Sequence, residues 1–99
     1  MLLYLKKEKL KINIKKLNRS LIKAHIDWVE KLNLSGIPAS TGYLIDKNNL
    51  PGGGGILLFN ANNYQEAEQI IKEDPIILSG EVEWELYEWT LLAGNLINK

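Results

Sequence analysis

The chain contains no cysteine and a single histidine, His25, among its 99 residues. Without cysteine it has no disulfide and no thiolate metal site, and one histidine is too few for the usual zinc ligand sets. We therefore expect no metal ion and no bound cofactor. The absence of cysteine also fits a reducing, cytoplasmic location.

Long apolar runs are absent as well. No stretch approaches the roughly 20 apolar residues that a transmembrane helix needs, and the first residues lack a signal peptide's apolar core and cleavage site. We expect no membrane partner. A chain of 99 residues with 45% hydrophobic content suits one compact domain.

Net charge is also lacking, because 12 basic residues balance 12 acidic ones. The two signs are nevertheless separated along the chain. Only Tyr4 interleaves the early basic run, whereas single-stranded nucleic acids stack on several aromatic side chains. We expect no nucleic-acid partner and interpret the run as solvated; an arm for nucleic acid or anionic lipid is the alternative. The basic run comprises Lys6, Lys7, Lys9, Lys11, Lys15, Lys16 and Arg19, and the late acidic group comprises Glu81, Glu83, Glu85 and Glu88.

Hydrophobic periodicity predicts four strands and two helices in the order βαββαβ. This order is typical of an α+β, ferredoxin-like fold, with a four-stranded antiparallel sheet, two helices on one face, and the first and last strands adjacent. Lys6 and Lys7 would then face the glutamates of the last strand. The predicted strands are 2–7, 37–46, 55–61 and 81–89, and the helices are 20–34 and 63–74.

His25 lies at the centre of the apolar face of the first helix. The second helix is expected to end at Asp74 and Pro75, and antiparallel helices would place Asp74 beside His25. An imidazolium near a helix N-terminus and a carboxylate at a helix C-terminus are both disfavoured by the helix dipole, so each needs a partner. In the catalytic interpretation, Asp74 fixes the tautomer of His25, which acts as general acid or base. The alternative is a buried structural pair.

The segment "PGGGG" at 51–55 lacks the Lys-Ser/Thr and the helix of a phosphate-binding loop. We interpret it as a flexible hairpin connection, with a ligand lid as the alternative. Trp28 and Trp84 are assigned to the core, with a stacking platform as the alternative. The continuously apolar strand after the glycines and the aromatic last strand predict that a second copy covers the bare sheet face, giving a homodimer and leaving a higher oligomer open.

Five segments resemble the YciI-like (YCII-related) family: "AHIDWVEKLNLSG", "ASTGYLID", "GGGG" before "ILLFNA", "EAEQIIKEDP" and "VEWELYEW". The resemblance spans about Ala24 to Trp89. It implies a single YciI-like domain over 1–99, a dimeric α+β barrel, and a site at His25 and Asp74. Some relatives carry an acidic residue late in the first strand, where Glu8 stands here.

Most members of the family have no assigned substrate, and the resemblance links one branch to dehydrochlorination of a chlorinated hydroxyhydroquinone. The wider superfamily includes muconolactone isomerases. Two functions stay open: a cofactor-free acid-base enzyme acting on a small aromatic or lactone-like molecule, and a non-catalytic dimeric module that binds a small molecule or a partner.

Overall fold

The computed structural model describes residues 1–49 and 51–96, the side chains of residues 51–53 excepted. The predicted order of strands and helices is confirmed, with one short helix added near the end. The elements are β1 (Leu2–Leu10), α1 (Arg19–Leu34), β2 (Ala39–Ile45), β3 (Pro51–Ala61), α2 (Tyr64–Ile71), α3 (Pro75–Ser79) and β4 (Val82–Glu88).

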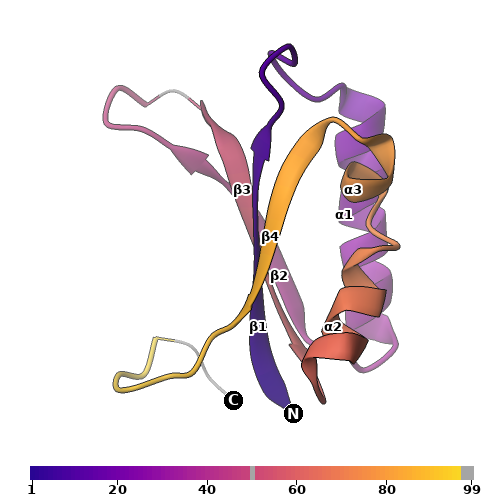
Figure 1. Ribbon diagram of the computed structural model, residues 1–99, viewed down its shortest axis with the longest axis vertical. Helices are drawn as coiled ribbons and strands as arrows, with labels where there is room; N and C mark the ends of the chain where they lie inside the picture. The colour runs from indigo at the N-terminus through magenta and orange to yellow at the C-terminus, as the bar shows by residue number, and fades with distance from the viewer. Residues whose placement is uncertain (50, 97–99) are drawn as a thin grey trace.

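The strands form one antiparallel sheet in the order β2-β3-β1-β4. All the helices lie on one face of this sheet, and the other face is uncovered (Figure 1). The first and last strands are neighbours, as expected. The fold is therefore α+β and ferredoxin-like, and its strand order fits a protomer of the dimeric α+β barrel type.

The core lies between the sheet and the helices because alternate side chains of each strand point to that side. Tyr4 of β1 lies opposite Phe59 of β3, and their ring centroids are 6.1 Å apart. Val29 of α1 and Ile71 of α2 close the layer from the helix side. Trp28 and Trp84 pack against this cluster while partly buried, which agrees with their assignment to the core.

Both longer helices begin at asparagine caps. The side chain of Asn18 accepts a hydrogen bond from the Leu21 amide, and Asn63 accepts one from the Glu66 amide. Such caps satisfy amides that have no partner within the helix. The end of α1 near Gly36, which has φ of 93°, is also as predicted.

The expected end of the second helix is wrong. The helix α2 ends at Ile71, and Asp74 is the N-cap of the additional helix α3, with its side chain accepting a hydrogen bond from the Ile76 amide. Pro75 occupies the first turn of α3, where a missing N–H costs nothing. The Asp-Pro pair therefore starts a helix, and Asp74 faces the favourable end of a helix dipole.

The expected hairpin connection at 51–55 is also corrected, because β3 already begins at Pro51. Gly54 pairs with Lys9 and Gly55 with Glu8. A Cβ atom at residue 54 would lie 2.6 Å from the backbone oxygen of Glu8. Close approach of neighbouring backbones requires glycine there. Leu50, just before this strand, lies outside the described residues.

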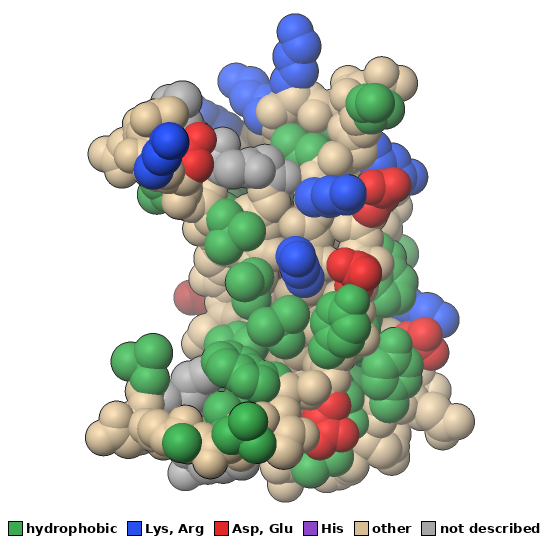
Figure 2. Space-filling model, turned by 60° about the vertical axis from the view of Figure 1, so that its left-hand side comes forward, with side chains coloured by type: hydrophobic (Ala, Val, Ile, Leu, Met, Phe, Trp, Pro, Cys, Tyr) green, Lys and Arg blue, Asp and Glu red, His purple; other side chains and the backbone are tan. Residues whose placement is uncertain are grey.

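The uncovered face is hollowed between two projecting segments and carries a column of apolar side chains (Figure 2). Strand alternation places Leu5, Ile56 and Leu58 there. Beside them, Lys7 lies opposite Glu85 and Lys9 opposite Glu83, as cross-strand charge pairing predicts. Among the described residues, no helix is both long and apolar enough to cross a bilayer.

Candidate functional site

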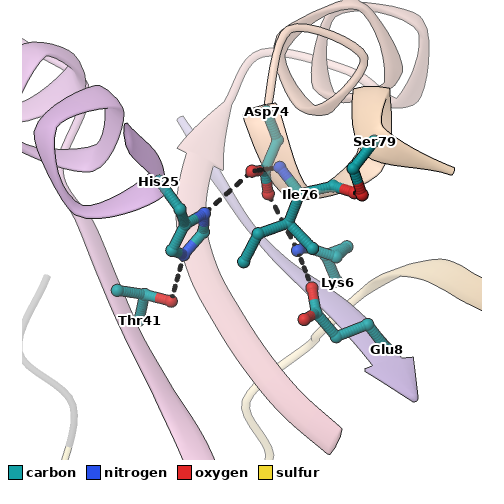
Figure 3. Close-up of polar contacts among 7 residues, drawn as sticks. All are labelled: Lys6, Glu8, His25, Thr41, Asp74, Ile76 and Ser79. Atoms are coloured by element: carbon teal, nitrogen blue, oxygen red, sulfur yellow. Dashed lines mark hydrogen bonds and ion pairs between the residues drawn. The ribbon is translucent and has the colours of Figure 1, made fainter. Parts of the chain in front are cut away.

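His25 projects from α1 into the space between helix and sheet. Only 5% of the residue is exposed, and its ring lies 5.9 Å from that of Trp28. Its Nδ1 atom is 2.8 Å from Asp74 Oδ1, and its Nε2 atom is 2.7 Å from Thr41 Oγ1 (Figure 3). The structure thus places the two sequence-predicted site residues in direct contact.

Asp74 is fully buried and its carboxylate has three partners. The oxygen Oδ1 accepts hydrogen bonds from His25 and from the Ile76 amide, and Oδ2 accepts one from Lys6 Nζ at 2.9 Å. Its backbone is held as the cap of α3. The carboxylate is therefore fixed in position on both oxygens, which fixes the imidazole that contacts it.

Lys6 supplies the positive charge of the site, and sequence reasoning missed this role. The residue was expected to face the glutamates of β4, but its Cα partner there is Leu86 and its side chain points to the helix side, where it is 1% exposed. Its ammonium contacts both Asp74 and Glu8. Lys6 and Glu8 share a strand face because they are two residues apart, and the inward face of β1 was the signal that would have revealed them.

The pKa of the Asp74 carboxyl lies below its ordinary value of 3.8. Burial by itself raises this pKa, but the hydrogen bond from His25 and the positive charge of Lys6 outweigh burial. Asp74 is therefore a carboxylate at neutral pH. Since a carboxylate only accepts hydrogen bonds, Nδ1 of His25 carries a proton, and in the neutral ring Nε2 is the basic atom.

Thr41 connects the buried ring to the surface. Its residue is exposed on β2, whereas His25 is buried, and its hydroxyl donates to Nε2 of the neutral ring. The sequence showed only a threonine in a strand, so this contact was missed. The site runs from Lys6 through Asp74 and His25 to the hydroxyl of an exposed residue.

The charges of the cluster suit proton transfer. The imidazole contacts the Asp74 carboxylate, which pairs with the Lys6 ammonium, and this ammonium also contacts the Glu8 carboxylate. With a neutral His25 the cluster has one excess negative charge, so a proton taken up on the ring is balanced by charge already present. The arrangement can hold an imidazole in one tautomer and stabilise the imidazolium, as a general base requires.

Two surface depressions lie beside the site, and neither is lined by His25, Thr41 or Asp74. One, of about 310 Å³, spans β1 and β4 and is lined by Glu8, Lys9 and Glu83; the other, of about 260 Å³, is lined by Trp28 and Ile70 among others. In the described part of the chain, no three His, Asp or Glu side chains are grouped as metal ligands.

No protein-family model matches the chain, and no curated protein matches its sequence. The solved structures that are similar include an enzyme and a designed protein. The first is 5-chloro-2-hydroxyhydroquinone dehydrochlorinase (TftG) from Burkholderia phenoliruptrix AC1100, in complex with 2,5-dihydroxybenzoquinone, with a TM-score of 0.68 and 19% identity over 89% of this chain and 93% of that one. The second is the de novo designed protein Foldit4, with a TM-score of 0.54 and 11% identity over 90% of this chain and 98% of that one.

At these identities the comparisons establish the fold alone. One similar structure belongs to an enzyme that acts on a small molecule, and the other to a designed protein. A shared fold therefore does not decide between catalysis and another role here, and function has to be argued from the site.

Proposed function

We propose that this protein is a cofactor-free enzyme that uses His25 as general acid or base on a small aromatic or lactone-like molecule. The observation that carries the proposal is the 2.8 Å contact between His25 Nδ1 and the buried, Lys6-paired carboxylate of Asp74. That contact leaves Nε2, on the side of exposed Thr41, as the atom that exchanges a proton with a substrate.

Each partner has a role in this proposal. Asp74 keeps the proton on Nδ1, and Lys6 keeps Asp74 ionised and oriented, so both act through His25. Aromatic and lactone-like substrates suit such a site because enolic and phenolic protons are moved readily by an imidazole near neutral pH. The enzyme of similar fold that was solved with 2,5-dihydroxybenzoquinone supports this substrate class.

The alternative is a non-catalytic module in which the pair is structural. In the described residues, every buried side-chain nitrogen and oxygen has a hydrogen-bond partner, as a structural network requires. The contact of Nε2 with the hydroxyl of an exposed residue favours the enzyme, because a substrate can approach the ring from that side.

We further propose that residues 1–99 form one YciI-like domain. Two copies of this domain would form a homodimer in the cytoplasm. The resemblance of 24–89 to that family supports the assignment, and the apolar column on the uncovered sheet face supports association. That association buries Leu5, Ile56 and Leu58 between two sheets.

The test uses the single histidine as a reporter. Nitrogen NMR of the imidazole gives the tautomer of His25 without ambiguity, because no other histidine contributes a signal. We expect the Nδ1-protonated form in the native protein. Titration with 2,5-dihydroxybenzoquinone, substituted phenols and small lactones should shift the Nε2 resonance, and a compound that does so becomes the candidate for turnover assays.

His25→Gln is the decisive variant, because glutamine keeps a polar group and removes the acid-base function. Turnover of the selected compound should fall by about 100-fold or more. If His25→Gln retains both binding and turnover, the pair is structural and the alternative holds. Lys23→Gln, on the exposed side of the same helix, should change neither.

A further inference from the structure

We propose that Thr41 is a nucleophile, and that Asp74, His25 and Thr41 form a triad able to take an acyl group from a small ester onto Thr41 Oγ1. The inference goes beyond acid-base catalysis but uses the same His25–Asp74 pair. The contacts are those of a nucleophile on a base that a carboxylate orients: Oγ1 to Nε2 at 2.7 Å and Nδ1 to Oδ1 at 2.8 Å.

The burial of the three residues sets the order in which a substrate reaches them. Asp74 is 0% exposed and His25 is 5% exposed, whereas Thr41 belongs to the exposed residues of β2. A reacting carbonyl therefore meets the hydroxyl first, with Nε2 of the imidazole directly behind it and the carboxylate deepest. This order of access, with the hydroxyl outermost, is the one that a nucleophilic triad needs.

A donor for the developing oxyanion lies at the same sheet edge. The Asn60 amide donates to the Pro38 carbonyl, so the pair Ala39 and Phe59 between them is not mutually hydrogen-bonded. Ala39 accordingly turns its N–H and C=O to the free edge of the sheet, where the Asn33 side chain binds both.

The same alternation applies two residues further along β2. Thr41 lies opposite Leu57 in the next pair of this type, so its own N–H also points to the free edge. The nucleophile thus carries a backbone donor beside its hydroxyl, as the oxyanion holes of acyl-transfer enzymes do.

The reaction balances without a further reagent. Oγ1 of Thr41 attacks the ester carbonyl while His25 Nε2 takes the hydroxyl proton, and the tetrahedral oxyanion forms. When the carbonyl re-forms, the bond to the alcohol oxygen breaks, and the proton on Nε2 passes to the leaving alcohol. Water, deprotonated by the same Nε2, then attacks the acyl-threonine, releases the acid and restores Thr41.

The experiment uses 4-nitrophenyl acetate with the full-length protein. We expect a burst of 4-nitrophenolate approaching one equivalent per chain, and one acetyl group that fragmentation of the peptide 32–47 places on Thr41. Thr41→Val, which keeps the shape and removes the hydroxyl, should lose the burst and the label. Thr41→Ser should retain both, and His25→Gln should slow labelling of Thr41 by about 100-fold.

Ser40 provides a control, because it is next to Thr41 in the chain but points to the opposite face of β2, away from His25. Ser40→Ala should behave as the native protein. Circular dichroism and thermal unfolding establish that each variant is folded. Absence of acetyl on Thr41 in folded native protein, or equal labelling of Ser40 and Thr41, overturns the proposal.

The two proposals fail separately. If Thr41 stays unlabelled while small phenols shift the His25 resonances and are turned over, the nucleophile is wrong and the acid-base function stands. If Thr41 is acetylated and no phenol or lactone binds, the nucleophile stands and the acid-base function on phenols and lactones is wrong.

Discussion

Gly55 lies directly opposite Glu8 across the β3–β1 pair, and Glu8 Oε2 lies 3.6 Å from the point that a Cβ atom on residue 55 would occupy. On its other side the same point is 2.9 Å from the backbone oxygen of Gly42. Gly55 therefore leaves room for the carboxylate that contacts Lys6, and no side chain fits there without movement of the sheet.

Gly55→Ala should lower the free energy of unfolding by about 1–3 kcal/mol, since the backbone of β2 has to yield. Urea denaturation measures the change. Gly42→Ala is the matched control: nothing lies within 4 Å of its Cβ position, so the loss there should be much smaller. Equal losses in the two variants would contradict the close-approach explanation.

Lys6→Met should cost about 3–5 kcal/mol of unfolding free energy, because it leaves the buried carboxylate of Asp74 and the half-buried one of Glu8 without the Lys6 cation. Adding Glu8→Gln to that variant should recover part of the loss. Chemical denaturation of the single and double variants gives the coupling energy. Lys7→Met, which changes the opposite and exposed face of the same strand, should stay within about 0.5 kcal/mol of the native protein.

The lowered pKa of Asp74 predicts a specific acid limb, that is, a range of low pH over which the free energy of unfolding falls. Between 3.8 and the lower folded pKa, the unfolded state binds more protons than the folded state, so stability falls as pH falls. The contribution of Asp74 is complete above 3.8 and is lost as pH drops through the folded pKa. Asp74→Asn should flatten this limb in urea titrations at successive pH values. Asp27→Asn, at an exposed carboxylate of α1, should leave the limb unchanged.

Association through the uncovered sheet face predicts that Leu58→Glu separates the copies. A buried charge there has no cation opposite it, so dimerisation should weaken by about 100-fold, corresponding to roughly 3 kcal/mol. Sedimentation velocity across a concentration series gives the constants. Leu78→Glu changes an equally apolar residue, 70% exposed on α3, and should leave the dimer intact. Native protein that sediments as a monomer at micromolar concentration would contradict the dimer.

Hydrophobic patterning was enough to predict the order of strands and helices, because apolar residues alternate along β4, form a continuous run in β3 and recur at helical spacing in α1. It also placed Asp74 beside His25, though for a reason that the structure corrects. Asp74 sits there as the cap of α3, and a five-residue helix is too short to show a period of its own.

Lys6 and Thr41, the other two residues of the site, were not predictable in the same way. Lys6 was read within a run of surface lysines, although its position two residues after Tyr4 puts it on the inward face. The contact of Thr41 with His25 depends on how far α1 sits above β2, a distance that no local pattern encodes. The extension of β3 through the glycines likewise depends on a neighbouring backbone, that of Glu8.

The polar network joins residues 6, 25, 41 and 74, which come from four separate segments of the chain. No single hairpin or helix pair contains the network, so a partly folded form cannot have all of its contacts. The network therefore assembles only when the last long-range loop closes. Exchange of the hydrogen-bonded sheet amides near the site should therefore follow global opening, and any ligand held at Thr41 should slow exchange of these amides.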